Sequence, residues 1–270
     1  MVIDYTMIHA RLIVLLTLLI TAPAWGQSKR SPRPKRTPSP YRRAYQKGVF
    51  VAPDSTSPQV PFVHFPYPLG KGINRATLGV TFTTSPRDIT EQTQLDVPAG
   101  DLVVLRGLNK NLALTGHLKF QFIQNNIMVG LRRSFPIKGR FYGSVGANIG
   151  GWVGILKLAD FNTTGFGTMA AADVALGFRS SRDLLVTLRL ETDLGLFNRT
   201  AVGQTVSDDS KLATNGYGAT VTLEQAFFGR RHAAIGFRAL YTNFNWQFWS
   251  LYDTFDRNIF YPEVFMGFFL

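Results

Sequence analysis

Apolar and polar side chains alternate with a period of two along residues 184–197. One set of alternate positions is almost entirely Leu and Val, whereas the other set carries Arg189, Glu191 and Asp193. Successive side chains of a strand point to opposite faces, so this pattern predicts a β-strand. The run exceeds the about 5–6 residues of a usual globular strand and is long enough to cross a bilayer, which takes roughly 9–11 residues. It therefore predicts a strand with lipid on one face and a polar lumen on the other.

The same alternation recurs along most of the chain after residue 73. The other runs that we predict as strands are residues 75–84, 101–108, 112–123, 127–135, 139–153, 167–179, 213–228, 231–246 and 258–270. Residues 101–108 alternate poorly, but both ends of the barrel are expected on the periplasmic side, which requires an even number of strands. The sequence thus predicts an all-β fold, a transmembrane antiparallel up-and-down β-barrel of about ten strands, with eight or twelve as alternatives.

Short and long connections alternate between these strands. The short connections are residues 136–139, 180–182 and 229–230. The longer and more polar ones are residues 154–166, 198–212 and 247–257. Membrane barrels combine short periplasmic turns with longer external loops. We therefore expect the first set in the periplasm and the second set outside the cell.

Aromatic side chains fall on the predicted lipid faces next to the short turns. They are Phe135, Phe141, Phe178 and Phe227. Girdles of aromatic residues at this height mark the membrane interfaces of barrels. The last run ends Val-Phe-Met-Gly-Phe-Phe-Leu, an apolar alternating strand that finishes at Leu270.

In strand length, aromatic placement and terminal strand, residues 75–270 resemble the small bacterial outer-membrane β-barrels of the OmpA/OmpX type. The resemblance is one of pattern rather than of motif. It implies a place in the bacterial outer membrane, contact with outer-membrane lipid, and recognition of the last strand by the barrel assembly machinery. The alternative is an antiparallel sandwich or a lipocalin-like barrel in water, because alternation alone does not tell which face lies outside.

Composition divides the chain into three expected parts. They are residues 1–26, a signal peptide, residues 27–72, a basic Pro-rich periplasmic tail and linker, and residues 73–270, the outer-membrane β-barrel. The signal is expected because Arg11 precedes an apolar run over residues 12–20 that is too short to span a membrane. Cleavage is expected after Gly26, with Ala24 as the alternative.

Positive charge is concentrated before the barrel. The chain has a formal net charge of +12, and residues 28–47 contain eight Lys and Arg side chains and no acidic one. We interpret this segment as docking to an anionic envelope polymer or membrane surface, with a solvated spacer as the alternative. Nucleic acid is not an expected partner of an exported chain. Residues 48–72 are rich in Pro and aromatic residues and are interpreted as a linker, with a plug folded back into the barrel as the alternative.

The polar faces of the strands predict a charged lumen. Its expected members are His117, Lys119, Arg132, Arg140, Asp173, Arg189, Glu191, Asp193, Glu224, Arg238 and Glu263. Both signs are present, and charges confined in a narrow barrel must pair because an unpaired buried charge is costly. A salt-bridged polar interior is therefore expected, with a narrow pore as the alternative.

Catalysis is not expected. Without Cys, the chain lacks thiolate chemistry and disulfides. His117 is the one histidine placed on a predicted lumen face, and no Ser in a nucleophile-like setting adjoins it. We predict no cofactor and no metal site, and a structural or interaction role, with a narrow channel for small solutes as the alternative.

One aromatic stretch between the last two strands is a candidate for contact outside the cell. Its members include Trp246, Trp249 and Tyr252. Aromatic side chains dominate binding hot spots, but they also form the outer aromatic belt of barrels, which is the alternative.

The basic tail gives a first prediction. Deletion of residues 28–47 should abolish co-sedimentation of the protein with purified cell wall, because the electrostatic attraction of eight cations is lost. The measurement is the bound fraction at low and high salt. Unchanged co-sedimentation of the deleted chain would contradict the docking interpretation.

Overall fold

The computed structural model describes residues 61–86, 96–158, 161–181, 184–202, 205–228, 231–249 and 257–270. All of them belong to one compact unit, Ser55–Leu270. No helix among these residues is long and apolar enough to cross a membrane.

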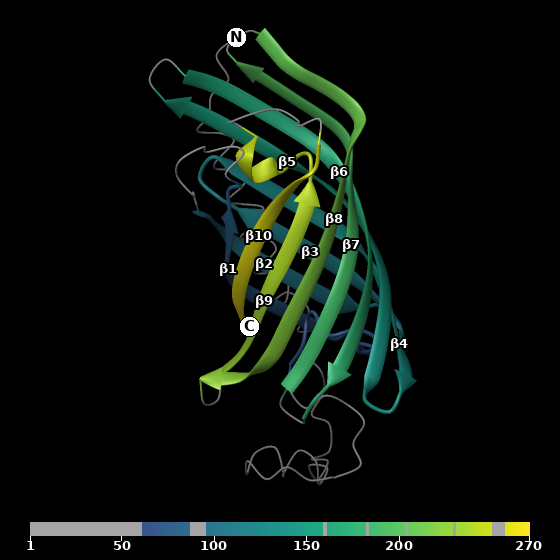
Figure 1. Cartoon of the computed structure of the whole chain (residues 1–270). Helices are drawn as coiled ribbons and strands as arrows, with labels where there is room; N and C mark the ends of the chain where they lie inside the picture. The colour runs from purple at the N-terminus through teal and green to yellow at the C-terminus, as the bar shows by residue number, and fades with distance from the viewer. Residues whose placement is uncertain are drawn as a thin grey trace, which may run out of the picture. The chain divides into compact units, whose positions relative to one another are not determined.

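Ten strands in the described residues close into one antiparallel barrel, which confirms the predicted fold class and strand number (Figure 1). The strands are β1 (Asn74–Thr84), β2 (Asp96–Gly107), β3 (Leu112–Phe120), β4 (Gln124–Lys138), β5 (Phe141–Leu158), β6 (Phe161–Arg179), β7 (Leu184–Val202), β8 (Thr205–Phe228), β9 (Arg231–Thr242) and β10 (Ile259–Phe269). A short 3₁₀ helix, η2 (Trp246–Phe248), lies between β9 and β10.

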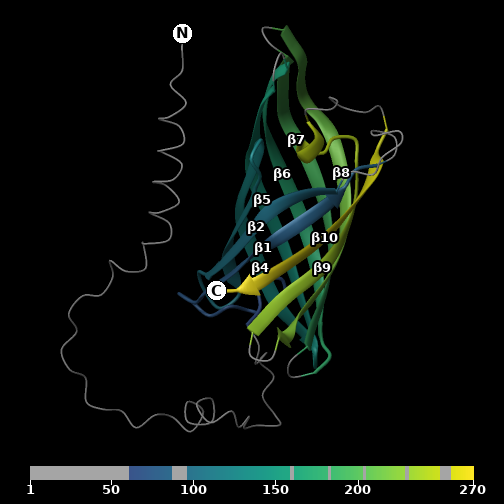
Figure 2. The same cartoon turned by 90° about the vertical axis from the view of Figure 1, so that its left-hand side faces the viewer.

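The barrel closes where the first strand meets the last. β1 pairs with β10 in a register that runs from Thr77 opposite Phe269 to Thr83 opposite Glu263. Every other strand pairs with its neighbours in the chain, so no sheet edge remains along the wall (Figure 2). Closure matters because lipid offers no hydrogen-bond partner to an open edge.

The poorly alternating run 101–108 is part of a strand, β2, as parity requires. Its weak pattern has a structural cause. Leu105 is buried on the inner face of the barrel, where it packs against Phe65 and Leu69 from the segment before β1. An apolar residue therefore occupies an inward position that elsewhere in the barrel is polar.

The outer surface of the barrel is apolar. Leu188, Leu190 and Leu194 of β7 are exposed, whereas Thr187 on the opposite face is buried. The same holds around the wall for Leu78, Val80, Ile127, Val129, Ile149, Val174, Val221 and Phe237. So continuous an apolar surface requires lipid rather than water around it. The alternative of a water-soluble barrel or sandwich is therefore wrong.

Aromatic side chains mark both edges of this apolar surface. Phe135, Phe141 and Phe178 are exposed at the end with the short turns, and the rings of Phe141 and Phe178 lie 5.0 Å apart. Phe166 lies twelve positions before Phe178 on the same outer face of β6. At about 3.3 Å per residue and a tilt of roughly 45°, these two rings are about 28 Å apart along the membrane normal, close to the thickness of a hydrocarbon core. The side chain of Phe227 lies outside the described residues.

Two connections predicted as loops are strands. Residues 154–166 and 198–212 belong largely to the hairpins β5–β6 and β7–β8, which extend beyond the barrel wall (Figure 1). The wall ends earlier on either side, because β4 begins opposite Gly154 and β9 ends opposite Gly216. Polar composition suggested loops, but the paired hairpins satisfy their own backbone hydrogen bonds above the membrane, where polar side chains meet water.

The position of the membrane gives a second prediction. Ile149→Arg places a charge near the middle of the apolar surface and should lower the free energy of unfolding by about 2–4 kcal/mol in lipid vesicles. Val202→Arg is the matched control. Val202 on β7 is similarly exposed, but it pairs with Thr163 of β6, which lies farther from the membrane than Phe166. The substitution should therefore lower the free energy of unfolding by only about 0–1 kcal/mol. Urea titration followed by Trp fluorescence measures both. Equal costs at the two positions would contradict this placement of the membrane.

Candidate functional site: the polar lumen

A chain of ion pairs crosses the inside of the barrel. Lys119 Nζ lies 3.1 Å from Glu263 Oε2, and Arg238 Nη1 lies 3.1 Å from the same oxygen. Arg238 also pairs with Glu191 through Nε and with Asp193 through Nη2, the latter at 2.9 Å. Lys119 lies on β3 and Glu263 on β10, with β2 and β1 between them in the wall. The contact therefore crosses the lumen instead of following the sheet.

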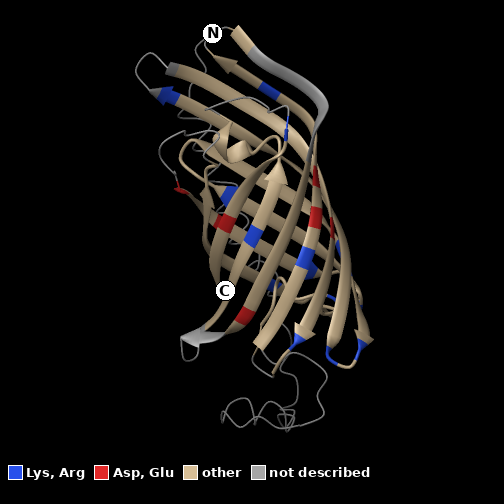
Figure 3. Ribbon diagram, viewed as in Figure 1, with Lys and Arg blue, Asp and Glu red and all other residues tan. Residues whose placement is uncertain are grey.

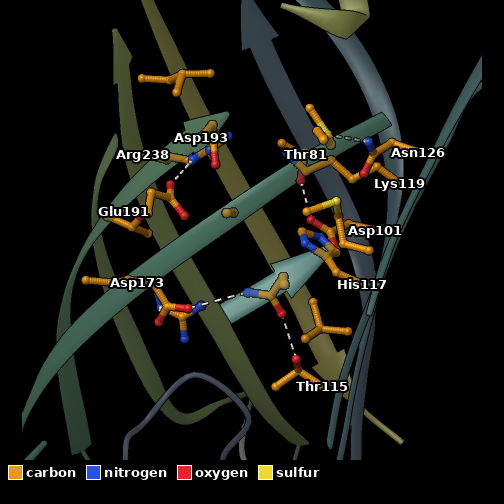
Figure 4. Close-up of a pocket in the computed structure, with 18 of the residues that line it drawn as sticks. Thr81, Asp101, Thr115, His117, Lys119, Asn126, Asp173, Glu191, Asp193 and Arg238 are labelled. Atoms are coloured by element: carbon orange, nitrogen blue, oxygen red, sulfur yellow. Dashed lines mark hydrogen bonds and ion pairs between the residues drawn. The ribbon is translucent and has the colours of Figure 1, made fainter. Parts of the chain in front are cut away.

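A second group of polar side chains lines another part of the lumen (Figure 4). His117 Nε2 lies 2.9 Å from Asp101 Oδ1, and the hydroxyl of Thr81 donates to Asp101 Oδ2 at 2.6 Å. Nearby, the hydroxyl of Thr115 donates to Asn148 Oδ1 at 2.8 Å. The two groups together make the lumen polar on several strands. Charged residues also gather at mid-height in Figure 3.

Glycines on the inner face make room for the acidic side chains. Gly146 is the register partner of Asp173, and a Cβ there would lie 2.3 Å from the carboxylate of Asp173. Gly218 is the register partner of Glu191, where a Cβ would lie 2.5 Å from a carboxylate oxygen. The glycines thus let these two carboxylates lie across the neighbouring strand.

The periplasmic end of the lumen is closed by residues 61–69, which we call the plug. The carboxylate of Glu224 on β8 accepts three backbone N–H groups, from Val63 at 2.6 Å, His64 at 2.9 Å and Phe65 at 2.7 Å. Arg132 on β4 donates through Nη1 to the carbonyl of Val63 at 2.7 Å. These contacts reach opposite parts of the wall, so the segment lies inside the barrel. This is the alternative considered for residues 48–72, and residues 48–60 lie outside the described part of the chain.

Apolar packing completes the closure by the plug. Phe62, Phe65 and Leu69 pack with Leu105, Ala113, Tyr142 and Leu185 from the inner face. The rings of Phe65 and Tyr142 lie 5.4 Å apart in an edge-to-face arrangement. Gly177 on β6 admits the plug, because a Cβ there would lie 2.5 Å from Pro66.

His64 is the plug residue that faces the polar part of the lumen. It lies before the first membrane strand, and burial together with the nearby Arg189 guanidinium lowers the pKa of His64 to about 3. The imidazole is therefore uncharged at neutral pH and adds no positive charge to the lumen.

Part of the external end of the lumen is covered by residues 244–249, between β9 and β10. Trp246 and Trp249 are buried and pack with Trp152 and Phe244. Trp249 lies against the inner face of β5, because a Cβ on Gly154 would lie 2.2 Å from its indole ring. We call Phe244–Trp249 the lid.

The structure places Trp246 and Trp249, the predicted candidates for external contact, in the lid. Both indoles are buried against Trp152 and Phe244, so they lie on neither an outward-facing contact surface nor an outer aromatic belt. The physical reason is the apolar inner surface that β5 and β6 offer above the polar lumen, where glycines leave space for the rings. Tyr252 lies outside the described residues.

Hydrogen bonds hold the lid to the wall. The side chain of Gln247 accepts from the hydroxyl of Thr83 at 2.6 Å, and its backbone carbonyl accepts from Gln124 Nε2 at 2.6 Å. A cavity of about 200 Å³ lies between plug and lid, lined by Val63 and His64 on one side and Phe244 and Trp246 on the other.

Most of the predicted lumen residues lie in the lumen. The structure places there His117, Lys119, Arg132, Asp173, Arg189, Glu191, Asp193, Glu224, Arg238 and Glu263. Arg140 is the exception, because it lies exposed in the β4–β5 turn and donates to the carbonyl of Ser180 at 3.2 Å. The predicted strand 139–153 includes Arg140 on its polar face. In the structure the chain turns at Gly139, where φ is +57°, and β5 begins only at Phe141, so Arg140 belongs to the turn.

Sequence reasoning missed Asp101 and His64 as members of the lumen. Asp101 lies in the run with the weakest alternation, where faces could not be assigned. The strand itself was predicted only because the barrel needs an even number of strands. In the structure Asp101 pairs opposite Lys119, which places its side chain on the inner face of the barrel. His64 had no periodic signal at all, because the plug is irregular.

The His117 arrangement does not have the geometry of a nucleophile and its base. The hydroxyl of Thr81 donates to Asp101, and not to the imidazole, so His117 is not placed to take its proton. No group of three or more His, Cys, Asp and Glu side chains in the described ranges could hold a metal ion.

No known family model matches the sequence, and no curated protein matches it. Among solved structures, the chain is similar to the KdgM porin, at 8% identity over 73% of this chain and 98% of that one, with a TM-score of 0.34. It is also similar to Neisserial surface protein A, at 13% identity over 73% and 96% of the two chains, with a TM-score of 0.32. A third likeness is to Ail of Yersinia pestis, at 9% identity over 74% and 99%, with a TM-score of 0.31. These likenesses concern the barrel fold alone.

The geometry of the barrel indicates where the protein lies in the cell. A closed antiparallel barrel with an apolar outer surface, aromatic edges and a polar interior is the architecture of bacterial outer-membrane barrels. The protein is a barrel of this small type and lies in the outer membrane.

The ion-pair chain gives a third prediction. Arg238→Met leaves Glu263 with Lys119 as its ion-pair partner and leaves Glu191 and Asp193 without one among the described residues, so it should lower the free energy of unfolding by about 3–5 kcal/mol. Urea titration in lipid vesicles measures the change.

Arg140→Met is the control for this variant, because Arg140 lies exposed in a turn and should cost within about 0.5 kcal/mol. A loss no larger for Arg238→Met than for the control would show that the ion-pair chain does not stabilise the barrel.

Proposed function

We propose that the protein is a non-catalytic outer-membrane barrel that forms a narrow passage for small polar solutes, and that the plug closes this passage at rest. The proposal chooses the channel over a purely structural role.

The observation that carries the proposal is the way in which the periplasmic end is closed. A small barrel can fill its interior with the side chains of its own strands. Here a separate segment outside the strands, residues 61–69, fills that end. A segment that precedes the first strand can leave without breaking any strand pairing, so this closure is reversible in principle.

One wall residue bears much of the polar anchoring of the plug. Glu224 is fully buried, and its carboxylate accepts three consecutive backbone N–H groups. Hydrogen bonds to charged groups are worth about 1.5–3 kcal/mol each. Glu224 therefore acts as a latch: the plug stays in the lumen while the Glu224 carboxylate keeps these hydrogen bonds.

The lining of the lumen supports the choice of solute. Ion pairs and hydroxyl or amide groups surround the cavity between plug and lid. Such a surface favours small polar solutes that exchange hydrogen bonds with the wall, and disfavours apolar ones.

A structural role is the second candidate, and the ion pairs that link β3, β10, β9 and β7 favour it. Cross-links through the lumen stiffen a barrel whether or not anything passes. The two candidates differ in conductance once the plug is released.

The latch gives a fourth prediction. Glu224→Ala removes the acceptor of three N–H groups and should convert a silent barrel into one with discrete openings in planar bilayers. Deletion of residues 61–69 should give the same openings, because it removes the plug itself. The matched control is Asp96→Ala, which removes an exposed carboxylate bonded to Thr84 and should stay silent.

The absence of Cys from the chain allows a direct check of plug release. Leu185→Cys places a thiol on the inner face, where the plug covers it. A maleimide should label this thiol faster in the double variant Leu185→Cys/Glu224→Ala than in Leu185→Cys alone. Silent bilayers for both Glu224→Ala and the plug deletion, with labelling increased, would assign the structural role instead.

A further inference from the structure

Arg132 has an unusual environment among the basic side chains of the lumen. It is 4% exposed and donates through Nη1 to the carbonyl of Val63 in the plug. Its Nε and Nη2 are buried and have no hydrogen-bond partner among the described residues. The side chain lines the cavity between plug and lid. Two nitrogen atoms of this guanidinium thus lack an acceptor, in a side chain that borders the cavity.

The other basic residues that line the cavity are paired. Lys119 contacts Glu263, Arg238 contacts three carboxylates, and Arg189 Nε lies 3.7 Å from Asp173 Oδ1. Arg132 is the one Lys or Arg of the cavity lining without an ion pair in the described part of the chain.

One candidate counter-ion, Glu224, is already hydrogen-bonded to the plug. Its two oxygens accept the three backbone N–H groups of Val63, His64 and Phe65, and it makes no ion pair with Arg132. A buried guanidinium without a paired anion is costly, and an anion that enters the cavity would remove that cost.

We propose that Arg132 binds the carboxylate of a small organic monoanion in this cavity, with the Arg189 guanidinium as a second positive charge in the cavity lining. The proposal rests on the proposed passage, because it names the class of solute that the passage accepts. The planar guanidinium offers two parallel N–H groups, which match the two oxygens of a carboxylate.

Charge and size narrow the class to monoanions with a short apolar chain. One unpaired cation balances one negative charge, and the carboxylates that also line the cavity, such as Asp173, disfavour a second negative charge on the ligand. The cavity of about 200 Å³ is many times the roughly 10–15 Å³ that one water needs. Val103, Met128 and Ala171 add apolar surface to its lining, which suits an aliphatic chain.

The experiment uses propionate and its neutral isostere propionamide as probes. Ligand-observed NMR titrations with the full chain in detergent micelles, at constant ionic strength set with sodium chloride, give the Kd of each. We expect saturable binding of propionate and none of propionamide, because only the carboxylate replaces the missing acceptor. Empty micelles are the blank.

Two variants assign the binding to the site. Arg132→Met should raise the Kd for propionate about tenfold to a hundredfold, as expected for the loss of charge-assisted hydrogen bonds. Arg189→Met is the second variant, with a smaller rise, in case the first does not fold. Arg140→Met removes an exposed turn guanidinium and should leave the Kd unchanged. Equal binding of the two probes, or propionate binding that survives both lumen variants, would overturn the proposal.

Propionate binding tests the anion site and bilayer conductance tests the passage, so the two proposals can be rejected independently. Propionate binding together with silent bilayers for the plug variants would remove the passage and leave the anion site. Openings of the Glu224→Ala barrel without propionate binding would support the passage and overturn the anion site.

Discussion

The structure depends on one constraint, which is that a chain in lipid must satisfy its polar groups within itself. The wall meets it by pairing β1 with β10, so that the backbone groups of every strand find partners around the closed barrel. Side chains meet the same constraint by sorting to two faces. Apolar side chains contact hydrocarbon, and charged side chains turn to an interior where they must find one another.

That sorting leaves the interior with more space than its ion pairs fill. The contacts of Arg238 and Lys119 cross the middle of the lumen, but they leave both ends open. The plug fills one end and the lid covers part of the other, and both combine aromatic packing with a few hydrogen bonds to the wall. Glycines on the inner face, such as Gly177 and Gly154, provide the room for these segments.

The plug connects the closure of the barrel with the chemistry of its cavity. Glu224 and Arg132 both bind Val63 of the plug, because Glu224 accepts from its N–H group and Arg132 donates to its carbonyl. Because the backbone of the plug occupies the carboxylate of Glu224, that carboxylate makes no ion pair with Arg132. The proposed anion site and the proposed gate at the periplasmic end therefore rest on one arrangement.

The sequence predicted about ten strands and the two faces of each strand, because a period of two and a required closure leave few solutions. It also indicated most of the lumen residues, since a charge opposite a run of Leu and Val has one place to go. It did not determine the length of the hairpins β5–β6 and β7–β8, because polar strands above the membrane have the composition of loops.

Only the tertiary structure decided where the irregular segments lie. Residues 61–69 and the indoles of Trp246 and Trp249 have no periodicity that assigns them a face, and an aromatic cluster suits lipid, a partner or a lumen equally well. Their positions depend on contacts across the barrel, such as Glu224 with Val63 and Trp249 with Gly154, which join residues far apart in the chain. The local sequence pattern does not predict such contacts, because they join residues that only the closed barrel brings together.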